Sequence, residues 1–475
     1  MSHANSTITE VTPGSGRFVK LLRESLAGTQ HDFTAGSLGR AITLLAIPMV
    51  LEMAMESLFA ICDIFFVARL GKDAVATVGL TESVLTLFYA VAIGLSMATT
   101  SMVARRIGEK DRERAAETGA QAIYLGIGVS LLFGLPGALF APELLQLMGG
   151  APWVIEEGSA YTSILLGTNA VVMLLFLNNA TFRGAGDAAV AMHTLWIANL
   201  INLVLDPCLI FGLGPFPELG IKGAAIATLC GRSTGVLYQF IVLRRGHRRI
   251  VLRGPALRLR PAVMGGLVRV SLGGIGQLLI GTASWVILMR VVSPYGSHAL
   301  AGYTIAIRIV IFALLPSWGL SNATATLVGQ SLGARKPERA ERAVWLTGLF
   351  NMVFLAGVMV VFLTLAPRLV AFFTDDASVS PVAEASLRII SYGYIFYAWG
   401  MVLTQAFNGA GDTMTPTWIN LVCYWTMQIP LAFLLSGHFG LGPDGVFWAV
   451  ATAESVLAVI AAVLFRRGRW KATLV

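Results

Sequence analysis

Charged side chains are scarce in this sequence: only 13% of its 475 residues are Asp, Glu, Lys or Arg, whereas 56% are hydrophobic. Soluble domains carry roughly 25% charged residues, so an ordinary soluble enzyme or nucleic-acid-binding protein is excluded. Cysteine is scarce too. The four cysteines form no C-x-x-C pair and no metal-site spacing, and we expect small buried hydrophobes: Cys62, Cys208, Cys230 and Cys423. The composition indicates an integral membrane protein.

Long apolar runs fill most of the chain instead. A helix needs about 20 apolar residues to cross the hydrocarbon core, and twelve runs have approximately that length: 42–70, 76–103, 121–141, 159–182, 190–213, 222–244, 264–292, 299–331, 343–366, 385–408, 417–436 and 446–466. Residues 1–40 are polar and lack the apolar core of a signal peptide. We expect them to form a cytoplasmic tail with a short amphipathic helix around 18–26.

Basic residues cluster in alternate loops. The net charge of +8 comes from 34 Lys and Arg against 26 Asp and Glu, and the clusters follow spans 2, 6, 8 and 12. Lys and Arg accumulate on the cytoplasmic side of membrane proteins, so both termini are predicted to be cytoplasmic. Because the clusters lie in short loops between spans, we interpret them as orientation signals and expect no nucleic-acid partner.

The sequence contains an internal repeat. A constant offset in residue number places the Gly184–Asp187 sequence Gly-Ala-Gly-Asp on the identical sequence at 409–412, and brings two further stretches, near 71–76 and 103–115, into register with 296–301 and 328–340. Near the end the offset becomes slightly shorter, and Gly223 meets Gly445. We therefore predict an all-α membrane protein of two parallel six-helix lobes, 41–244 and 262–467, around a central cavity. A basic linker, 245–261, joins them, and 468–475 forms a second cytoplasmic tail.

Ionisable groups lie inside the first span. Glu52, Glu56 and Asp63 follow Pro48 at spacings of four and seven residues, which places all four on one helical stripe. Each charge costs several kcal/mol in hydrocarbon unless it is paired or hydrated. The repeat offset turns Glu52 into Gln277 and leaves no acid at the other two positions. The acidic stripe is therefore confined to the first half, which favours a function over a scaffold.

The fifth span carries a second polar stripe, formed by His193, Trp196, Asn199, Asn202 and Asp206. Two such stripes are expected to line one hydrated cavity. For Asn199 and His193, hydrogen bonding that holds helices together is an equally good reading.

Other embedded charges and aromatics have simpler readings. Arg308 and Glu454 are expected to pair with each other, and a position facing the cavity is the alternative. Arg232, Arg290 and Arg388 are expected to lie near helix ends with their charges extended to the interface. Aromatic residues of the tenth span could line a pocket for flat cations or serve packing: Tyr392, Tyr394, Phe396, Tyr397 and Trp399.

The two Gly-Ala-Gly-Asp stretches also match the Gly-x-Gly-Asp pattern of intramembrane aspartyl proteases. Both lie at the ends of spans, where a glycine turn and a helix-capping aspartate explain them. No HExxH pair and no nucleophile–base arrangement is present. We expect no enzyme.

The sequence resembles the multidrug and toxic compound extrusion (MATE) family over nearly its whole length. The matching segments are Pro48 with Asp63–Val67, Leu70–Gly71, Ala74 and Val78–Leu80, the two Gly-Ala-Gly-Asp turns, Asn202–Pro207, and Gly220 with Gly223–Thr228. The resemblance implies two lobes arranged as a V and cation-coupled export of organic cations and other toxic compounds from a bacterial inner membrane.

The prokaryotic DinF-like branch of that family implies particular roles. Its coupling site in the first lobe corresponds here to Asp63, Asn202, Asp206, Thr228 and Asn179 (or Asn178), and its helix-bending proline to Pro48. Carboxylates of other branches in spans 7 and 10 have no counterpart here. Glu52 and Glu56 are additional to the pattern and, with Asn178 and Asn199, are assigned to the substrate cavity, although a coupling role for the two acids stays open.

Related flippases of lipid-linked oligosaccharides are the alternative. Members of that group are longer, with fourteen spans and a basic cavity, whereas this chain has twelve expected spans and an acidic first lobe. The coupling ion stays open between H⁺ and Na⁺, the latter with a site at Asp63, Asn202 and Asp206. We expect no other cofactor, a monomer in the bilayer, and organic cations as substrates.

Overall fold

Helices form nearly all regular structure in the computed structural model, which describes residues 14–28, 31–245 and 249–473; no β-strand occurs among these residues. The first half contains α1 (Gly14–Ala27), α2 (Leu38–Ala68), α3 (Lys72–Gly108), α4 (Arg112–Leu139), α5 (Ala141–Leu147), α6 (Pro152–Glu156), α7 (Gly158–Gly167), α8 (Asn169–Ala185), α9 (Ala188–Phe211) and α10 (Ile221–Arg245). Helix α1 confirms the short helix expected in the N-terminal tail.

The second half begins after a 3-10 turn at Gly254–Leu257. It contains α11 (Pro261–Val292), α12 (Ser297–Gly333), α13 (Pro337–Ala371), α14 (Ser380–Tyr392), α15 (Tyr394–Ala410), α16 (Met414–Asn420), α17 (Ile429–Phe433) and α18 (Pro443–Arg466). Two π-helical segments, Leu421–Gln428 and Leu434–His438, flank α17, and short 3-10 turns occupy Ser293–Tyr295 and Arg469–Ala472.

Twelve spans account for these helices. Ten among the described residues are long and apolar enough to cross a membrane, and α7 with α8, bent by 42°, makes an eleventh. In the second half, α14 with α15 holds the place of α7 with α8, and counting this pair as one span gives the twelve that were expected. The sequence predicted both broken spans as continuous. The helix is interrupted at Thr168 and at Gly393. Both residues lie within apolar runs, and apolar character alone does not predict an interruption.

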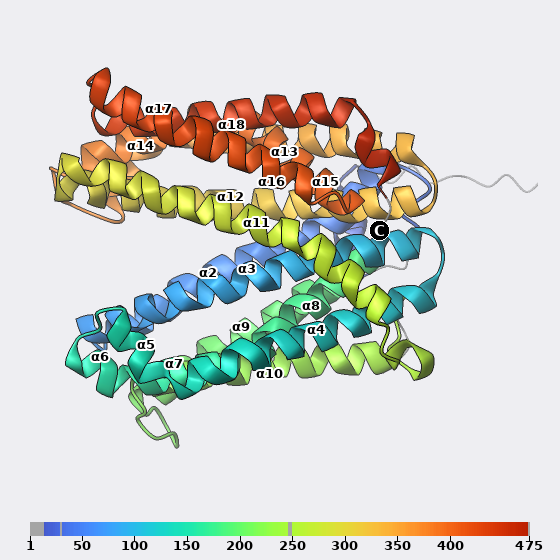
Figure 1. Cartoon of the computed structure of the whole chain (residues 1–475), viewed down its shortest axis with the longest axis horizontal. Helices are drawn as coiled ribbons and strands as arrows, with labels where there is room; N and C mark the ends of the chain where they lie inside the picture. The colour runs from blue at the N-terminus through green and yellow to red at the C-terminus, as the bar shows by residue number, and fades with distance from the viewer. Residues whose placement is uncertain (1–13, 29–30, 246–248, 474–475) are drawn as a thin grey trace, which may run out of the picture.

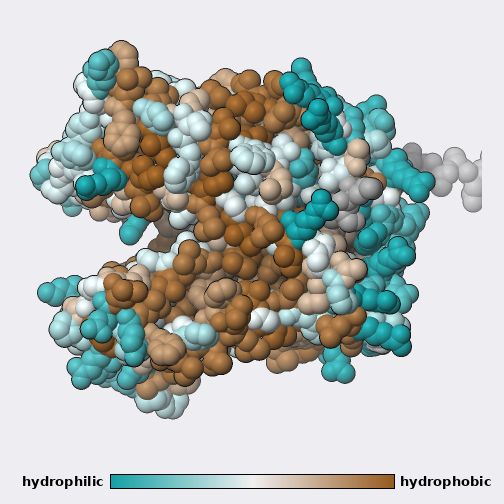
Figure 2. Space-filling model, viewed as in Figure 1, coloured by the Kyte–Doolittle hydropathy of each residue, from teal (hydrophilic) through white to brown (hydrophobic). Residues whose placement is uncertain are grey.

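The helices form two lobes that diverge at one end and meet at the other (Figure 1). Helices α2–α10 make the first lobe and α11–α18 the second. The lobes join where α2 packs against α12 and α3 packs against α11. On the face that Figure 2 shows, apolar residues cover the middle of both lobes, hydrophilic residues gather at the ends, and a hollow separates the lobes at the open end. The predicted two-lobe fold is confirmed.

The cysteines do not all lie in the core. Cys423 is buried as expected, but Cys62 and Cys208 are half-buried and Cys230 is exposed. The expectation of four buried residues is therefore wrong for three of them. Lipid tails are as apolar as a protein core, so a small apolar side chain within a span gains little from burial inside the protein.

The repeat is visible in local geometry. Gly186 and Gly411 end α8 and α15 in the left-handed conformation, with φ of 81° and 86°, and Asp187 and Asp412 follow them. Asp412 accepts hydrogen bonds from the Thr415 backbone and hydroxyl, as a helix cap does. The two aspartates lie in different lobes, each directly after the glycine that ends its helix.

A segment before α2 closes the joined end. Arg339 at the start of α13 donates hydrogen bonds to the carbonyl oxygens of Phe33, Ala35 and Gly36, at 3.0, 2.8 and 2.9 Å. Thr326 and Gln330 of α12 donate to carbonyl oxygens at the end of α8, at 3.0 and 2.9 Å. Backbone groups therefore seal one lobe against the other at this end.

Candidate functional site

The polar stripes of α2 and α9 face each other in the first lobe. The Asn199 amide donates to a Glu56 carboxylate oxygen at 3.1 Å, and the Trp196 indole donates to the Leu51 carbonyl at 3.2 Å. Asp63 and Asp206, further along, lie within range of direct charge–charge interaction. The expectation that the two stripes share one site agrees with these contacts.

Asn202 links Asp206 on its own helix to Thr228 on α10. In the amide orientation that satisfies both of its ends, Asn202 donates to an Asp206 carboxylate oxygen at 2.7 Å and accepts from the Thr228 backbone N–H at 3.0 Å. Its oxygen also lies 3.2 Å from the Thr228 hydroxyl. Three of the five residues assigned to coupling are thus joined directly, because the four-residue spacing places Asn202 and Asp206 on adjacent turns.

Asp63 lies beside this cluster and is only partly buried. Among the described residues it makes no hydrogen bond or ion pair, although the charges of Glu82 on α3 and Arg232 on α10 act on it. Sequence reasoning missed Glu82. It is an isolated acid within a long apolar span, and the rule that embedded charges mark functional sites would have found it.

Glu52 belongs to a separate, buried network. Its carboxylate accepts from Asn179 at 3.3 Å and from Arg183 at 3.2 Å. Gln239 of α10 donates to the Asn179 oxygen at 2.7 Å and accepts from Asn178 at 3.1 Å. Asn178 is fully buried, so it packs between helices and does not line the cleft in this conformation. Asn179 contacts Glu52, and no hydrogen bond joins it to Asp63.

Glu56 also has a cationic partner. Arg232 donates to Glu56 at 3.3 Å, lies over the Phe59 ring, and is buried. The expectation that Arg232 reaches the interface is therefore wrong: a carboxylate in the lobe compensates the charge that would otherwise have to reach water. Both additional acids of the first span are neutralised by arginines that come from distant parts of the chain.

The second lobe replaces the first of these ion pairs by amides. Gln277 and Asn408, which the repeat places on Glu52 and Arg183, hydrogen-bond each other at 3.0 Å. The expected pairing of Glu454 with Arg308 is not formed. Glu454 accepts from the Tyr424 hydroxyl at 3.0 Å, whereas the charge of Arg308 acts on Glu82 across the cleft.

Oxygen donors dominate the Asp63–Asp206 cluster. Carboxylate, amide and hydroxyl oxygens suit Na⁺, a hard cation, and two neighbouring carboxylates also suit H⁺. Among the described residues, no three His, Cys, Asp or Glu side chains gather as a transition-metal site would require. The cluster can therefore exchange a small cation while its two acids change their mutual repulsion.

Two six-span lobes around a cleft with embedded acids define a membrane transporter. The chain belongs to the MatE family, whose model matches residues 48–208 and 275–434.

Relatives extend this result. The chain is 25% identical over 432 residues to the probable multidrug resistance protein NorM of Thermotoga maritima, covering 90% of this chain and 92% of that protein. It is 24% identical to an FAD transporter of Shewanella oneidensis, covering 92% and 96%. A solved structure described as the outward-facing conformation of a multidrug resistance MATE family transporter superposes with a TM-score of 0.87 at 25% identity, covering 94% and 100%. These relatives are transporters, and the two described as multidrug resistance proteins support drug or toxin export.

Proposed function

We propose that this protein is a cation-coupled antiporter that exports organic cations and other drugs or toxic metabolites by alternating access. The observation that carries the proposal is the Asp63–Asp206 pair beside Asn202 and Thr228. One proton or Na⁺ there neutralises part of the repulsion between two carboxylates that share a low-dielectric site.

The coupling step follows from that charge change. Asp63 lies on α2, which contacts α9 in its own lobe and α12 in the other. Helix α2 is continuous through Pro48, whose missing N–H removes one backbone hydrogen bond and makes a bend less costly there. Cation binding at Asp63 favours a bend of α2, and the bend biases which end of the cleft is open.

We assign the joined end to the cytoplasm, because it carries the basic residues of the loops after spans 2 and 8. The structure then represents the conformation open to the outside. In this proposal the protein works as a monomer in a bacterial inner membrane. Glu56 borders the cleft as a substrate contact, and the buried Asn199 holds the Glu56 carboxylate through its amide. Glu52 and Arg183 fix α2 to α8, and Asn179 supports Glu52.

An imposed gradient tests the proposal. Proteoliposomes that contain the protein are loaded with ethidium. An inward H⁺ gradient or, in a separate experiment, an inward Na⁺ gradient is then imposed. Gradient-driven loss of ethidium from the lumen supports the antiporter and identifies its ion. Efflux at the same rate with neither gradient contradicts coupling.

An anionic substrate is the second candidate, either a lipid-linked sugar pyrophosphate or a flavin nucleotide. Two observations favour it: arginines neutralise Glu52 and Glu56, which reduces the repulsion of an anion, and one relative is an FAD transporter. Export of FAD but not ethidium would support this candidate. Complementation of a strain that lacks its lipid-linked-sugar flippase would support the flippase.

A further inference from the structure

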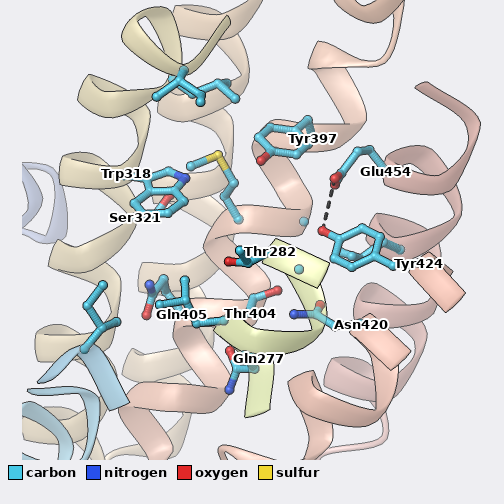
Figure 3. A pocket seen from close by; sticks show the side chains of 18 of the residues that line it. Gln277, Thr282, Trp318, Ser321, Tyr397, Thr404, Gln405, Asn420, Tyr424 and Glu454 are labelled. Atoms are coloured by element: carbon cyan, nitrogen blue, oxygen red, sulfur yellow. Dashed lines mark hydrogen bonds between the residues drawn. The ribbon is translucent and has the colours of Figure 1, made fainter. Parts of the chain in front are cut away.

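A cavity of about 470 Å³ lies in the second lobe, outside the Asp63 cluster (Figure 3). Its volume lies within the range of about 300–1,000 Å³ typical of small-molecule sites. Helices α11, α12, α15, α16 and α18 and the π-helical segment Leu421–Gln428 line it, together with α3 of the first lobe through Ile93 and Met97. Both lobes therefore contribute to its wall, so the cavity changes shape when the lobes move.

The cavity has an acidic and aromatic side. Figure 3 shows Glu454 and Tyr424 facing each other, with Tyr397 beside them and the Trp318 ring across the space. Glu454 is only 9% exposed, and Trp318 is 45% exposed. Amide and hydroxyl groups lie away from the acid: Gln277, Thr282, Thr404, Gln405 and Asn420.

Glu454 has no counter-charge. One carboxylate oxygen accepts from Tyr424, and among the described residues no cationic side chain pairs with it or acts on it electrostatically. Burial of this carboxylate as an unpaired charge costs several kcal/mol, so the group either takes up a proton or needs a cationic partner. Glu52 and Glu56 in the same chain differ from Glu454, because each of them is paired with an arginine.

The repeat shows where that cation belongs. Gly223 and Gly445 press in the same way against the backbone of the preceding span, at Leu209 and at Ser436. The offset that relates these two glycines also relates Arg232 to Glu454. At the offset of the Gly-Ala-Gly-Asp turns, Glu56 corresponds to Gly281, which lines the cavity and has open space where a side chain would lie. An ion pair fills this position in the first lobe, whereas the second lobe has an acid and a void.

We propose that this cavity binds a flat aromatic monocation, with Glu454 as the counter-charge and Trp318, Tyr397 and Tyr424 as its aromatic walls. A positive ring faces π-electron clouds and one carboxylate, and the amide groups fix its orientation. This inference rests on the proposed function for its substrate class. It adds a drug-binding site in the second lobe to the substrate contact at Glu56, and ion coupling stays in the first lobe.

Binding to the purified full-length protein in detergent tests this proposal, with ethidium as the probe and fluorescence anisotropy as the readout. Glu454→Gln is expected to weaken ethidium binding about tenfold, the equivalent of one lost charge contact. Gly281→Leu fills the void without changing any charge and is expected to weaken binding similarly. Glu338→Gln, an exposed acid at the start of α13, is the matched control and should bind as the wild type does.

Neutral phenanthridine, the ring system of ethidium, separates charge from shape. Its binding should survive Glu454→Gln and be lost in Gly281→Leu. Ethidium binding that both variants leave unchanged would overturn the proposal, and so would equal loss of both probes in Glu454→Gln. Should Glu454→Gln melt at a lower temperature than the wild type, Gly281→Leu alone decides. If ethidium binds as predicted but no gradient drives its efflux, the proposed function fails and this site stands.

Discussion

Gly108 and Gly333 hold matching positions at the ends of α3 and α12, and each lies directly against the backbone of the other helix. A Cβ atom on Gly108 would collide with the Gln330 carbonyl, and one on Gly333 with the Arg105 carbonyl. Since the repeat also places Arg105 on Gln330, the contact is reciprocal. The joined end of the molecule is therefore a near-symmetric seal that only residues without a side chain allow.

Gly108→Ala tests this seal. The added methyl group opposes contact of the two helices, with overpacking that costs about 1–3 kcal/mol, and so favours conformations in which this end is open. Ethidium efflux from proteoliposomes is expected to fall at least about fivefold, with the melting temperature little changed. Gly128→Ala, whose Cβ would meet open space, is the control. Wild-type efflux in Gly108→Ala would show that the seal is not needed for the cycle.

The second lobe provides a substitute for the Glu52–Arg183 ion pair. Arg183→Asn alone leaves Glu52 buried without its cation and is expected to cost about 3 kcal/mol of stability. Adding Glu52→Gln copies the Gln277–Asn408 pair of the second lobe and should restore most of that loss. Thermal unfolding of the two variants in detergent measures this. A double variant as unstable as Arg183→Asn would contradict the equivalence of the two sites.

The stability contributed by the turn before α2 should depend on pH in a definite direction. Asp32 accepts hydrogen bonds from the Thr34 hydroxyl and backbone, at 2.6 and 2.9 Å, and the hydroxyl contact is the main reason that the pKa of Asp32 lies below its ordinary value. Its stabilising contribution is therefore complete above the ordinary pKa and is lost as the pH falls through the lowered value.

The difference in melting temperature between the wild type and Asp32→Asn measures this contribution. We expect a small difference at pH 7 that shrinks as the pH falls below the ordinary pKa of an aspartate. A difference in melting temperature that grows on acidification would contradict this prediction.

The sequence predicted the span number, the repeat and the two facing stripes, because apolar length and helical spacing are local properties. The arginines that pair with the acids of the first span were not predictable from local sequence. Arg232 and Glu56 lie in different spans, far apart along the chain, and only the fold brings them together. The cavity beside Glu454 was missed for a related reason: a void arises from what Gly281 lacks, and a residue pattern records only what is present.

Asp63 is the centre of the coupling proposal, and its neutral variant tests it most directly. Purified Asp63→Asn in proteoliposomes, assayed beside the wild type under the imposed ion gradient, should be folded, with a normal melting temperature, and should bind ethidium. It should show no gradient-driven efflux, because an amide neither takes up a proton in this pH range nor offers a negative charge to Na⁺. Full gradient-driven efflux by Asp63→Asn with normal thermal stability would contradict the account.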